Sequence, residues 1–256
     1  MSDKAGPRIV SVRISRSGCD GTIATAHSRF RPLHRRAVPS EPLIDILHHD
    51  DSLLVVRKPA GLLSVPGRGE HLQDCVAARV QAIWPDALIV HRLDMATSGL
   101  MVMARGPAAQ RALGSAFEHR SVTKQYVAVV AGDVAGDAGS VDLPLCADWP
   151  NRPRQKVDAA MGRPSLTHWR RATPAHEGST TGDIDRTRLE LEPVTGRSHQ
   201  LRVHLLALGH PILGDTLYAP DAVQRMAPRL LLHASRIALP HPAGGGICVF
   251  SDPPAF

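Results

Sequence analysis

Cysteine and long apolar runs are both scarce in this 256-residue chain, and each scarcity excludes a class of protein. The four cysteines, Cys19, Cys75, Cys146 and Cys248, are scattered and form no C-x-x-C pair. Such spacing argues against a disulfide framework or a zinc knuckle and indicates reduced thiols in a cytoplasm. No apolar run reaches the ~18 residues that a transmembrane helix needs, and the N-terminus lacks the basic-then-apolar layout of a secretory signal. We therefore expect a cytoplasmic protein without a membrane partner.

Histidine is plentiful, with 14 residues, but its spacing does not predict a metal site. His199 and His204 are five positions apart, which is the wrong spacing for two ligands on one helical face. We treat both as non-ligands and expect no bound metal.

The formal charge of +6 and the pI of about 9.6 suggest a polyanionic partner. The whole excess lies within residues 1–40, which hold eight Lys or Arg and two Asp. Residues 41–256 hold 22 basic and 22 acidic residues, so the body must attract a polyanion through a local patch. We expect residues 1–40 to be a disordered basic arm, with an inert extension as the open alternative, and residues 41–256 to form one folded domain.

The segment from His91 to Leu100 places polar groups between two apolar runs that read as buried strands. Asp94 is the only carboxylate between Asp86 and Glu118. Arg92, two residues earlier, could compensate the charge of Asp94. A carboxylate that must stay charged in a cleft is nevertheless expected to need a second cation from elsewhere in the chain. The alternative is structural: the carboxylate would accept hydrogen bonds from the amides of residues 97–99 and brace the loop.

A helix is predicted after Gly196, with Ser198 as its cap, Leu201, Leu205 and Leu208 as its apolar stripe and Gly209 at its end. Arg202 lies ~100° around the helix from Leu201, at the margin of the buried face. A guanidinium can be buried there only if it is paired.

Other elements follow from hydrophobic periodicity and breaker residues. Helices are expected at 71–84, with Val76, Val80 and Ile83 on one face, and at 107–119. Strands are expected at 53–56, 124–130, 165–172, 187–192, 230–232 and 247–250, and a loop at 131–147.

Three motifs together resemble the RluA family of RNA pseudouridine synthases. His91-Arg92-Leu93-Asp94, followed by Thr97-Ser98-Gly99, is similar to the family's active-site signature; Lys124-Gln125-Tyr126 matches its second motif, and 195–205 matches its third. The resemblance extends over roughly 43–256. It implies a catalytic Asp94, a Tyr126 that lies against the target base, and an Arg202 that pairs with Asp94. From the residues alone, Tyr126 could equally be a core tyrosine on a strand.

The same resemblance implies the remaining site residues. Arg92 would enter the space left by the flipped uridine. Arg152, Arg154 and Lys156 stand at alternate positions, on one side if the chain is extended, and resemble a segment near the RNA groove. The full set expected to bind substrate is Arg92, Thr97, Ser98, Gly99, Arg152, Arg154, Lys156, Arg197, His199 and Leu231.

The fold implied is the α+β pseudouridine synthase fold, a long mixed and largely antiparallel sheet with flanking helices and a central active-site cleft. No S4-type RNA-binding domain is recognisable. The resemblance is to the dual-specificity synthase A subgroup, which implies RNA as partner, in the form of a 23S rRNA hairpin loop and a tRNA anticodon stem-loop. The reaction breaks the N1–C1′ bond of uridine and joins C5 to C1′, so it needs no cofactor, and we expect a monomer.

Two alternatives stay open at this stage, and a third is disfavoured by the residues. The chain could be a catalytically silent RNA-binding or ribosome-assembly protein on the same scaffold, although Asp94, Tyr126 and Arg202 are all present. It could also be a synthase restricted to ribosomal RNA. A glycoside hydrolase would need two carboxylates flanking the bond, and the signature offers one.

Overall fold

The computed structural model describes residues 44–172 and 185–256, so the expected basic arm at 1–40 lies outside the described residues. A ten-stranded sheet forms the centre of the described part. Its strands are β1 Asp45–His49, β2 Leu53–Lys58, β3 Ala87–Ile89, β4 Ser98–Arg105, β5 Thr123–Ala131, β6 Ala138–Asp142, β9 Leu166–Arg171, β10 Arg186–Pro193, β11 Leu232–Pro240 and β12 Ile247–Ser251. The helices are α1 Val76–Gln81, α2 Gly106–Glu118, α3 Gln200–Ala207 and α4 Asp221–Gln224.

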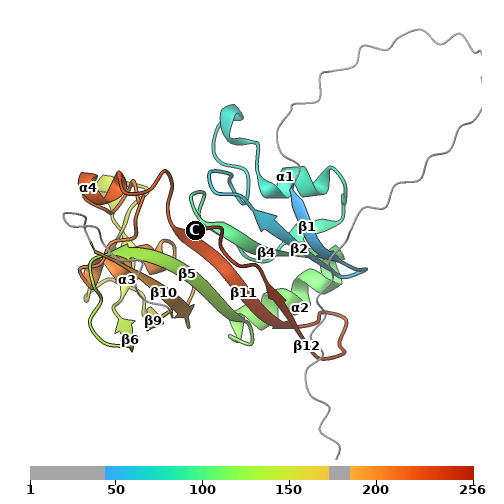
Figure 1. Ribbon diagram of the computed structural model, residues 1–256. Helices are drawn as coiled ribbons and strands as arrows, with labels where there is room; N and C mark the ends of the chain where they lie inside the picture. Colours follow the sequence, from blue (N-terminus) through green and yellow to red (C-terminus); the bar gives the residue numbers. More distant parts are fainter. Residues whose placement is uncertain (1–43, 173–184) are drawn as a thin grey trace, which may run out of the picture.

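The sheet runs in the order β1-β2-β4-β11-β5-β10-β9-β6, with β3 on β4 and β12 on β11. Only the β4–β11 pair is parallel among the described strands, and the others are antiparallel. Figure 1 shows the long strands β5 and β11 crossing the middle of the molecule, with α1 and α2 on one side and α3 and α4 on the other. The predicted mixed, largely antiparallel sheet with flanking helices is confirmed.

Strand β4 is buried on both faces, which explains its unbroken apolar run. Met101 and Met103 belong to the core that α1 covers, whereas Leu100 and Val102 belong to the core that α2 covers. In the other half, Ala128 and Val130 of β5 pack with apolar residues of β10 and α3. The sheet therefore carries separate cores in its two halves.

Tyr126 packs against the edges of two of these cores, the one under α1 and the one under α3. It stands on β5, opposite Ala234 of β11. The centre of the sheet is thus the place where loops from the first half can meet helix α3 from the second half.

The parallel contact between β4 and β11 is short and needs a glycine. Gly99 has φ +110°, and a Cβ there would lie 2.3 Å from the Ala234 carbonyl oxygen. No L side chain fits such an approach, so Gly99 lets the two strands touch and brings the loop that precedes it over β5 and β11.

Several predicted boundaries were wrong. Helix α1 ends at Gln81, and Ile83 is 52% exposed rather than part of its buried face. Helix α3 begins after His199 with no side-chain cap, so Ser198 does not cap it, and Leu208 lies outside its buried stripe. The expected loop at 131–147 holds β6 and the short strand β7 Leu145–Ala147, which pairs with β8 Gln155–Val157. No helix among the described residues is long and apolar enough to span a membrane.

Candidate active site

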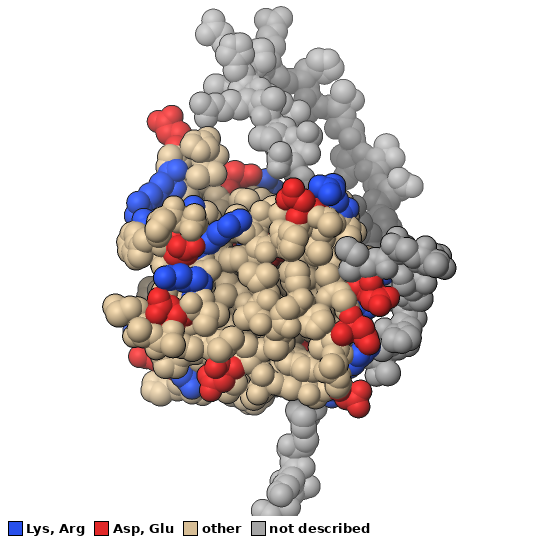
Figure 2. Space-filling view, turned by 90° about the vertical axis from the view of Figure 1, so that its left-hand side faces the viewer, with Lys and Arg blue, Asp and Glu red and all other residues tan. Residues whose placement is uncertain are grey.

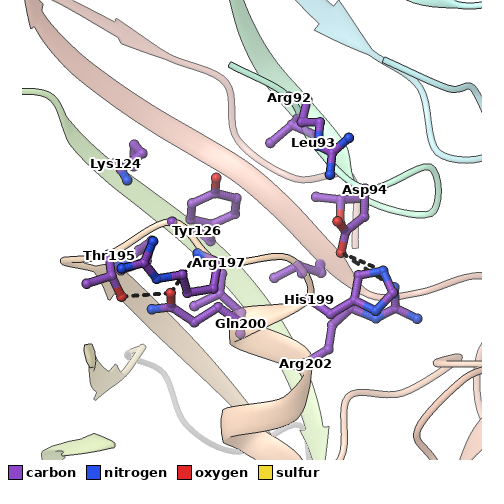
Figure 3. Close-up of a pocket in the computed structure, with 15 residues that line it drawn as sticks. Arg92, Leu93, Asp94, Lys124, Tyr126, Thr195, Arg197, His199, Gln200 and Arg202 are labelled. Atoms are coloured by element: carbon purple, nitrogen blue, oxygen red, sulfur yellow. Dashed lines mark hydrogen bonds and ion pairs between the residues drawn. The ribbon is translucent and has the colours of Figure 1, made fainter. Parts of the chain in front are cut away.

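An open pocket lies where the loop before β4, the strand β5 and the start of α3 meet. Figure 3 shows its lining residues converging on one space from these three elements. The lining is Arg92, Leu93, Asp94, Thr97, Lys124, Tyr126, Pro193, Thr195, Gly196, Arg197, His199, Gln200, Leu201, Arg202 and Leu232. The three residues expected to be catalytic, Asp94, Tyr126 and Arg202, are therefore brought together.

The Asp94 carboxylate is partly exposed to the pocket and meets two nitrogen groups through a single oxygen. Arg202 Nη1 lies 3.5 Å from Oδ2, and His199 Nε2 lies 3.9 Å from the same atom. Among the described residues, Oδ1 has no hydrogen bond or ion pair. The Thr97 amide donates to the Asp94 main-chain oxygen at 3.1 Å, so the loop is braced by backbone while the carboxylate is left for the pocket.

Arg202 is the second cation that Asp94 needs, and it has another acidic partner. Its Nε and Nη2 donate to the two carboxylate oxygens of Asp215 at 2.8 and 2.6 Å, and both side chains are buried. Burial by itself would lower the pKa of Arg202, but the bonds to Asp215 and the field of Asp94 raise it above its ordinary value. The sequence reasoning missed Asp215, although a buried guanidinium signals a partner of this kind.

Tyr126 presents an uncharged ring to the pocket. Burial, with a smaller effect of Asp94, raises the pKa of Tyr126 above its usual range. Figure 3 shows its ring between Lys124 and Asp94. An aromatic face in this position can stack on a base that has left its helix.

His91, at the start of the signature loop, anchors the loop to β4 and α2. Its Nε2 accepts a hydrogen bond from the Val102 amide at 2.9 Å, and its ring stacks on Phe117 with centroids 4.8 Å apart. Burial, together with the charge of Lys124, lowers the pKa of His91 to about 4, so this imidazole is a neutral anchor at physiological pH.

Three pocket cations have no acidic partner among the described residues. Arg92 reaches Ser198 Oγ at 3.4 Å, Arg197 reaches the Pro164 carbonyl at 3.4 Å, and Lys124 makes no ion pair there. Burial and the neighbouring cations lower the pKa of both Lys124 and Arg197. The pocket thus has a positive excess, and Lys124 is a lining residue that the expected site left out.

The turn that carries Arg197 and His199 is fixed by Gln200. Gln200 Oε1 accepts from the Thr195 hydroxyl at 2.7 Å and from the Arg197 amide at 3.0 Å. Its amide nitrogen donates back to the Leu166 carbonyl of β9 at 3.0 Å. These bonds fix the start of α3, the role that was expected of Ser198. His199, which precedes the helix, has a left-handed conformation with φ 54°.

Several residues expected to bind substrate do not line the pocket. The Ser98 hydroxyl is 2.9 Å from His233 Nδ1, and Gly99 lies against β11. Leu231 packs against an apolar cluster that includes Val129 and Leu213. Thr97, Arg92, Arg197 and His199 do line it.

The segment 148–156 is extended only at its end. A short 3₁₀ turn at Trp149–Asn151 and a turn at residues 152–153 precede β8, so Arg152 lies outside the extended part that the expectation required. Arg152 stacks over the exposed Trp149 ring at 3.5 Å, and Lys156 pairs with Asp158 at 3.2 Å. The segment lies outside the pocket lining.

No group of three or more potential metal ligands occurs in the described ranges.

Comparison with known proteins identifies the class. Residues 52–207 match the family described as RNA pseudouridylate synthase, so the chain belongs to that family and is an RNA isomerase that makes pseudouridine. The predicted family and enzyme class are confirmed.

At finer detail, the chain is 51% identical over 218 residues to the dual-specificity RNA pseudouridine synthase RluA of Escherichia coli strain K12. The match covers 85% of this chain and 96% of that protein. The protein of the same name from Pasteurella multocida is 46% identical over the same length. Among solved structures, human RNA pseudouridylate synthase domain containing 1 is similar with a TM-score of 0.69 and 27% identity, covering 83% of this chain and 84% of that chain.

Proposed function

We propose that this synthase isomerises loop uridines in two structured RNAs, a tRNA anticodon stem-loop and a 23S rRNA hairpin loop. The proposal is supported by the similarity to the Escherichia coli dual-specificity enzyme along 96% of that protein's length. Exposed loop bases flip at low cost, so short hairpins are suitable substrates.

The observation that carries the chemistry is the asymmetric environment of the Asp94 carboxylate. Arg202 and His199 both lie on the Oδ2 side, and Oδ1 has no partner among the described residues. The Arg202 guanidinium is the nearest counterion of this carboxylate. Asp94 then either attacks C1′ as N1 departs or removes the C2′ proton, and both routes are compatible with one free oxygen. The base then rotates and C5 bonds to C1′. In the first route the Asp94–C1′ ester bond breaks as this bond forms, and in the second route Asp94 returns the proton to C2′. C5 finally loses its proton and N1 gains one.

Tyr126 and Arg92 have separate roles in this proposal. Tyr126 stacks on the uracil and limits its motion while it is detached from the sugar. Arg92, which is exposed at the pocket edge and bonded only weakly to Ser198, occupies the gap left in the RNA stack.

Backbone phosphates are the natural counterions for the unpaired pocket cations. Lys124 and Arg197 can each neutralise a phosphate next to the flipped nucleotide. Trp149 with its stacked Arg152 offers a second contact for RNA outside the pocket. On the face seen in Figure 2, Lys and Arg lie around the margin among Asp and Glu, and the centre is uncharged. That face has no continuous basic track.

The test uses two synthetic hairpins, one with the anticodon stem-loop and one with the ribosomal loop, each incubated with the full chain. Pseudouridine is detected by mass spectrometry after chemical tagging, because isomerisation leaves the RNA mass unchanged. Both hairpins are expected to gain one tagged site. Reaction of the ribosomal hairpin alone would replace the proposal with a ribosome-restricted synthase. Tight binding without tagging of either hairpin would instead support a silent RNA-binding protein.

A further inference from the structure

His199 is held between the Asp94 carboxylate and the Tyr218 hydroxyl. Its Nε2 faces Asp94 Oδ2 at 3.9 Å, and its Nδ1 lies 2.6 Å from the Tyr218 oxygen. The rings of His199 and Tyr218 meet edge to face, with centroids 5.6 Å apart. Figure 3 shows His199 beside Arg202 under the same carboxylate. The imidazole side chain is only 13% exposed, so solvent has little part in fixing its protons.

The proton on the Tyr218 hydroxyl can be placed by counting donors. The main-chain amide of Gln155 donates to the Tyr218 oxygen at 2.7 Å. A phenol has one proton to give, and in the described part of the chain its only other hydrogen-bond neighbour is His199 Nδ1. Every group is satisfied when Tyr218 donates to a bare Nδ1. The proton of a neutral His199 is then on Nε2.

The Asp94 carboxylate also favours a proton on Nε2 of His199. With its proton on Nε2, His199 points an N–H at Asp94 Oδ2. The opposite tautomer would point a lone pair at a negative oxygen, which is repulsive at this distance in a partly desolvated site.

We propose that Tyr218, oriented by the Gln155 amide, is a positioning residue that fixes the Nε2–H tautomer of His199 and so keeps a neutral donor on Oδ2 of Asp94. The inference deepens the proposed function, since it rests on Asp94 as the reacting group. Arg202 and His199 together hold Oδ2, and the carboxylate presents Oδ1 to the sugar. The amide that orients Tyr218 belongs to β8, between Arg154 and Lys156, so the segment expected to contact RNA also sets the proton at the reacting centre.

The electrostatics of the cluster agree with this assignment. Burial is the main cause that lowers the pKa of His199; Arg202 and Arg92 add to that effect, while Asp94 and Asp215 oppose it. These charged groups and Tyr218 are the ones that face the imidazole. Burial raises the pKa of Tyr218, so its hydroxyl keeps the proton that it must donate.

The first test reads the tautomer directly, without activity. Long-range ¹H–¹⁵N correlation spectra of histidine-labelled protein distinguish a protonated from a bare ring nitrogen, and His199→Gln identifies the His199 signals by their loss. We expect the Nε2–H tautomer in the wild type and a mixture of tautomers in Tyr218→Phe. Gln155→Ala is the matched control, because it keeps the amide and should leave the tautomer unchanged. A wild-type Nδ1–H tautomer would overturn the proposal.

The second test reads the consequence for turnover. Tyr218→Phe should lower kcat by about ten-fold to a hundred-fold, the scale on which loss of a partner that orients a metal-bound histidine matters, with KM for a hairpin RNA unchanged. Loss of the donor to Nδ1 makes His199 more basic, so the acid limb of the kcat profile should move to higher pH. Thermal denaturation checks that the variant is folded.

A double-variant cycle separates this role from general damage. Glutamine at 199 carries an amide donor that needs no choice of tautomer. Tyr218→Phe should therefore cost nothing further in a His199→Gln background. Equal losses in both backgrounds would refute the tautomer role. If neither hairpin reacts even with the wild type, the proposed substrates fail, and the spectra still decide the tautomer.

Discussion

Arg202 serves two carboxylates at once, and this sharing decides what each substitution can reveal. Asp215 is fully buried and takes two of the guanidinium bonds, whereas Asp94 is partly exposed and takes one long contact. Asp215 therefore secures the position of Arg202, and Asp94 is free to react beside a cation that does not depend on it.

Asp94→Asn should abolish isomerisation while leaving the fold intact. Arg202 keeps its pairing with Asp215 in this variant, so no buried charge is left alone. Turnover should fall by more than about a thousand-fold, because general acid–base help alone is worth ~10²–10⁴. Tagged mass spectrometry measures turnover, and fluorescence anisotropy with the same hairpin shows that binding persists. Residual turnover above about a thousandth of wild type would remove Asp94 from the nucleophile and base roles.

Arg202→Met should lose stability as well as activity. The substitution leaves the buried Asp215 carboxylate without its cation, and breaking a buried pair in this way costs about 3–5 kcal/mol of unfolding free energy. Urea denaturation measures the loss. Adding Asp215→Asn should restore part of it, because the asparagine oxygen can still accept from the Leu217 and Tyr218 amides. The double variant should stay inactive; recovered turnover would contradict a role for Arg202 at Asp94.

At the scale of elements, the signature loop is tied to the turn that follows β2. The side-chain nitrogen of the fully buried Lys58 donates to the carbonyls of Pro59 and Met95, each at 2.8 Å. The Gly61 amide also donates to Met95, and Ser64 Oγ bonds to both the amide and the carbonyl of Leu93. Bonds from the turn thus hold the backbone on both sides of Asp94.

Lys58 should make the stability of the protein depend on alkaline pH. Burial lowers its pKa from 10.5 to about 7, with Asp94 acting in the opposite sense. Between these values the unfolded chain binds a proton that the folded chain does not, so this group makes stability rise with pH from about 7 to about 10. Its share of the slope is at most ~1.4 kcal/mol per pH unit.

The check is urea denaturation of wild type and Lys58→Met at several pH values in that window. The difference in unfolding free energy between the two proteins should change across it, with the wild type gaining relative to the variant as the pH rises. Parallel curves would mean that Lys58 stays charged in the folded state.

The sequence predicted most of the elements because their signals are local. Strand β2, helix α2 and strand β12 follow from short apolar periods that no distant contact alters. The boundaries of α3 could not be found in this way. Its start is set by the bonds of Gln200 to β9 and to Thr195, and the helix ends at Ala207, before the solvent-exposed Leu208. The turn at Trp149–Asn151 is closed by bonds from Asn151 to Asp148, a local signal that the alternate spacing of the cations does not contain.

For the candidate site too, only the residues that belong to recognisable motifs could be predicted. Motif resemblance brought Asp94, Tyr126 and Arg202 together, and the structure places all three on one pocket. Asp215 and Tyr218 were missed because they come from a loop whose sequence has no catalytic pattern of its own. The roles of all these residues stay predictions until they are tested.

At the scale of the whole molecule, the site lies where two separately packed halves meet. The Asp94 loop belongs to the half with α1 and α2, Arg202 belongs to the half with α3, and Tyr126 on β5 contacts a core in each. One sheet continues through both halves by way of β11, which holds the reacting groups at fixed separation. The sheet positions these groups without any net charge on residues 41–256.

The formal charge excess is instead confined to residues 1–40, outside the described residues. These residues contain no family motif, so their cations should add affinity by releasing counterions from RNA and should not take part in the chemistry. Each phosphate that they neutralise should steepen the plot of log affinity against log salt by ~0.9 on duplex or ~0.7 on single strands.

Deleting residues 1–38 should therefore weaken hairpin binding at low salt and flatten that plot. Turnover at saturating RNA should be unchanged, because the pocket residues remain. A salt titration of full-length and truncated protein on one hairpin measures both slopes; equal slopes would make the segment inert, and lost saturating turnover would mean that it supports the catalytic domain directly.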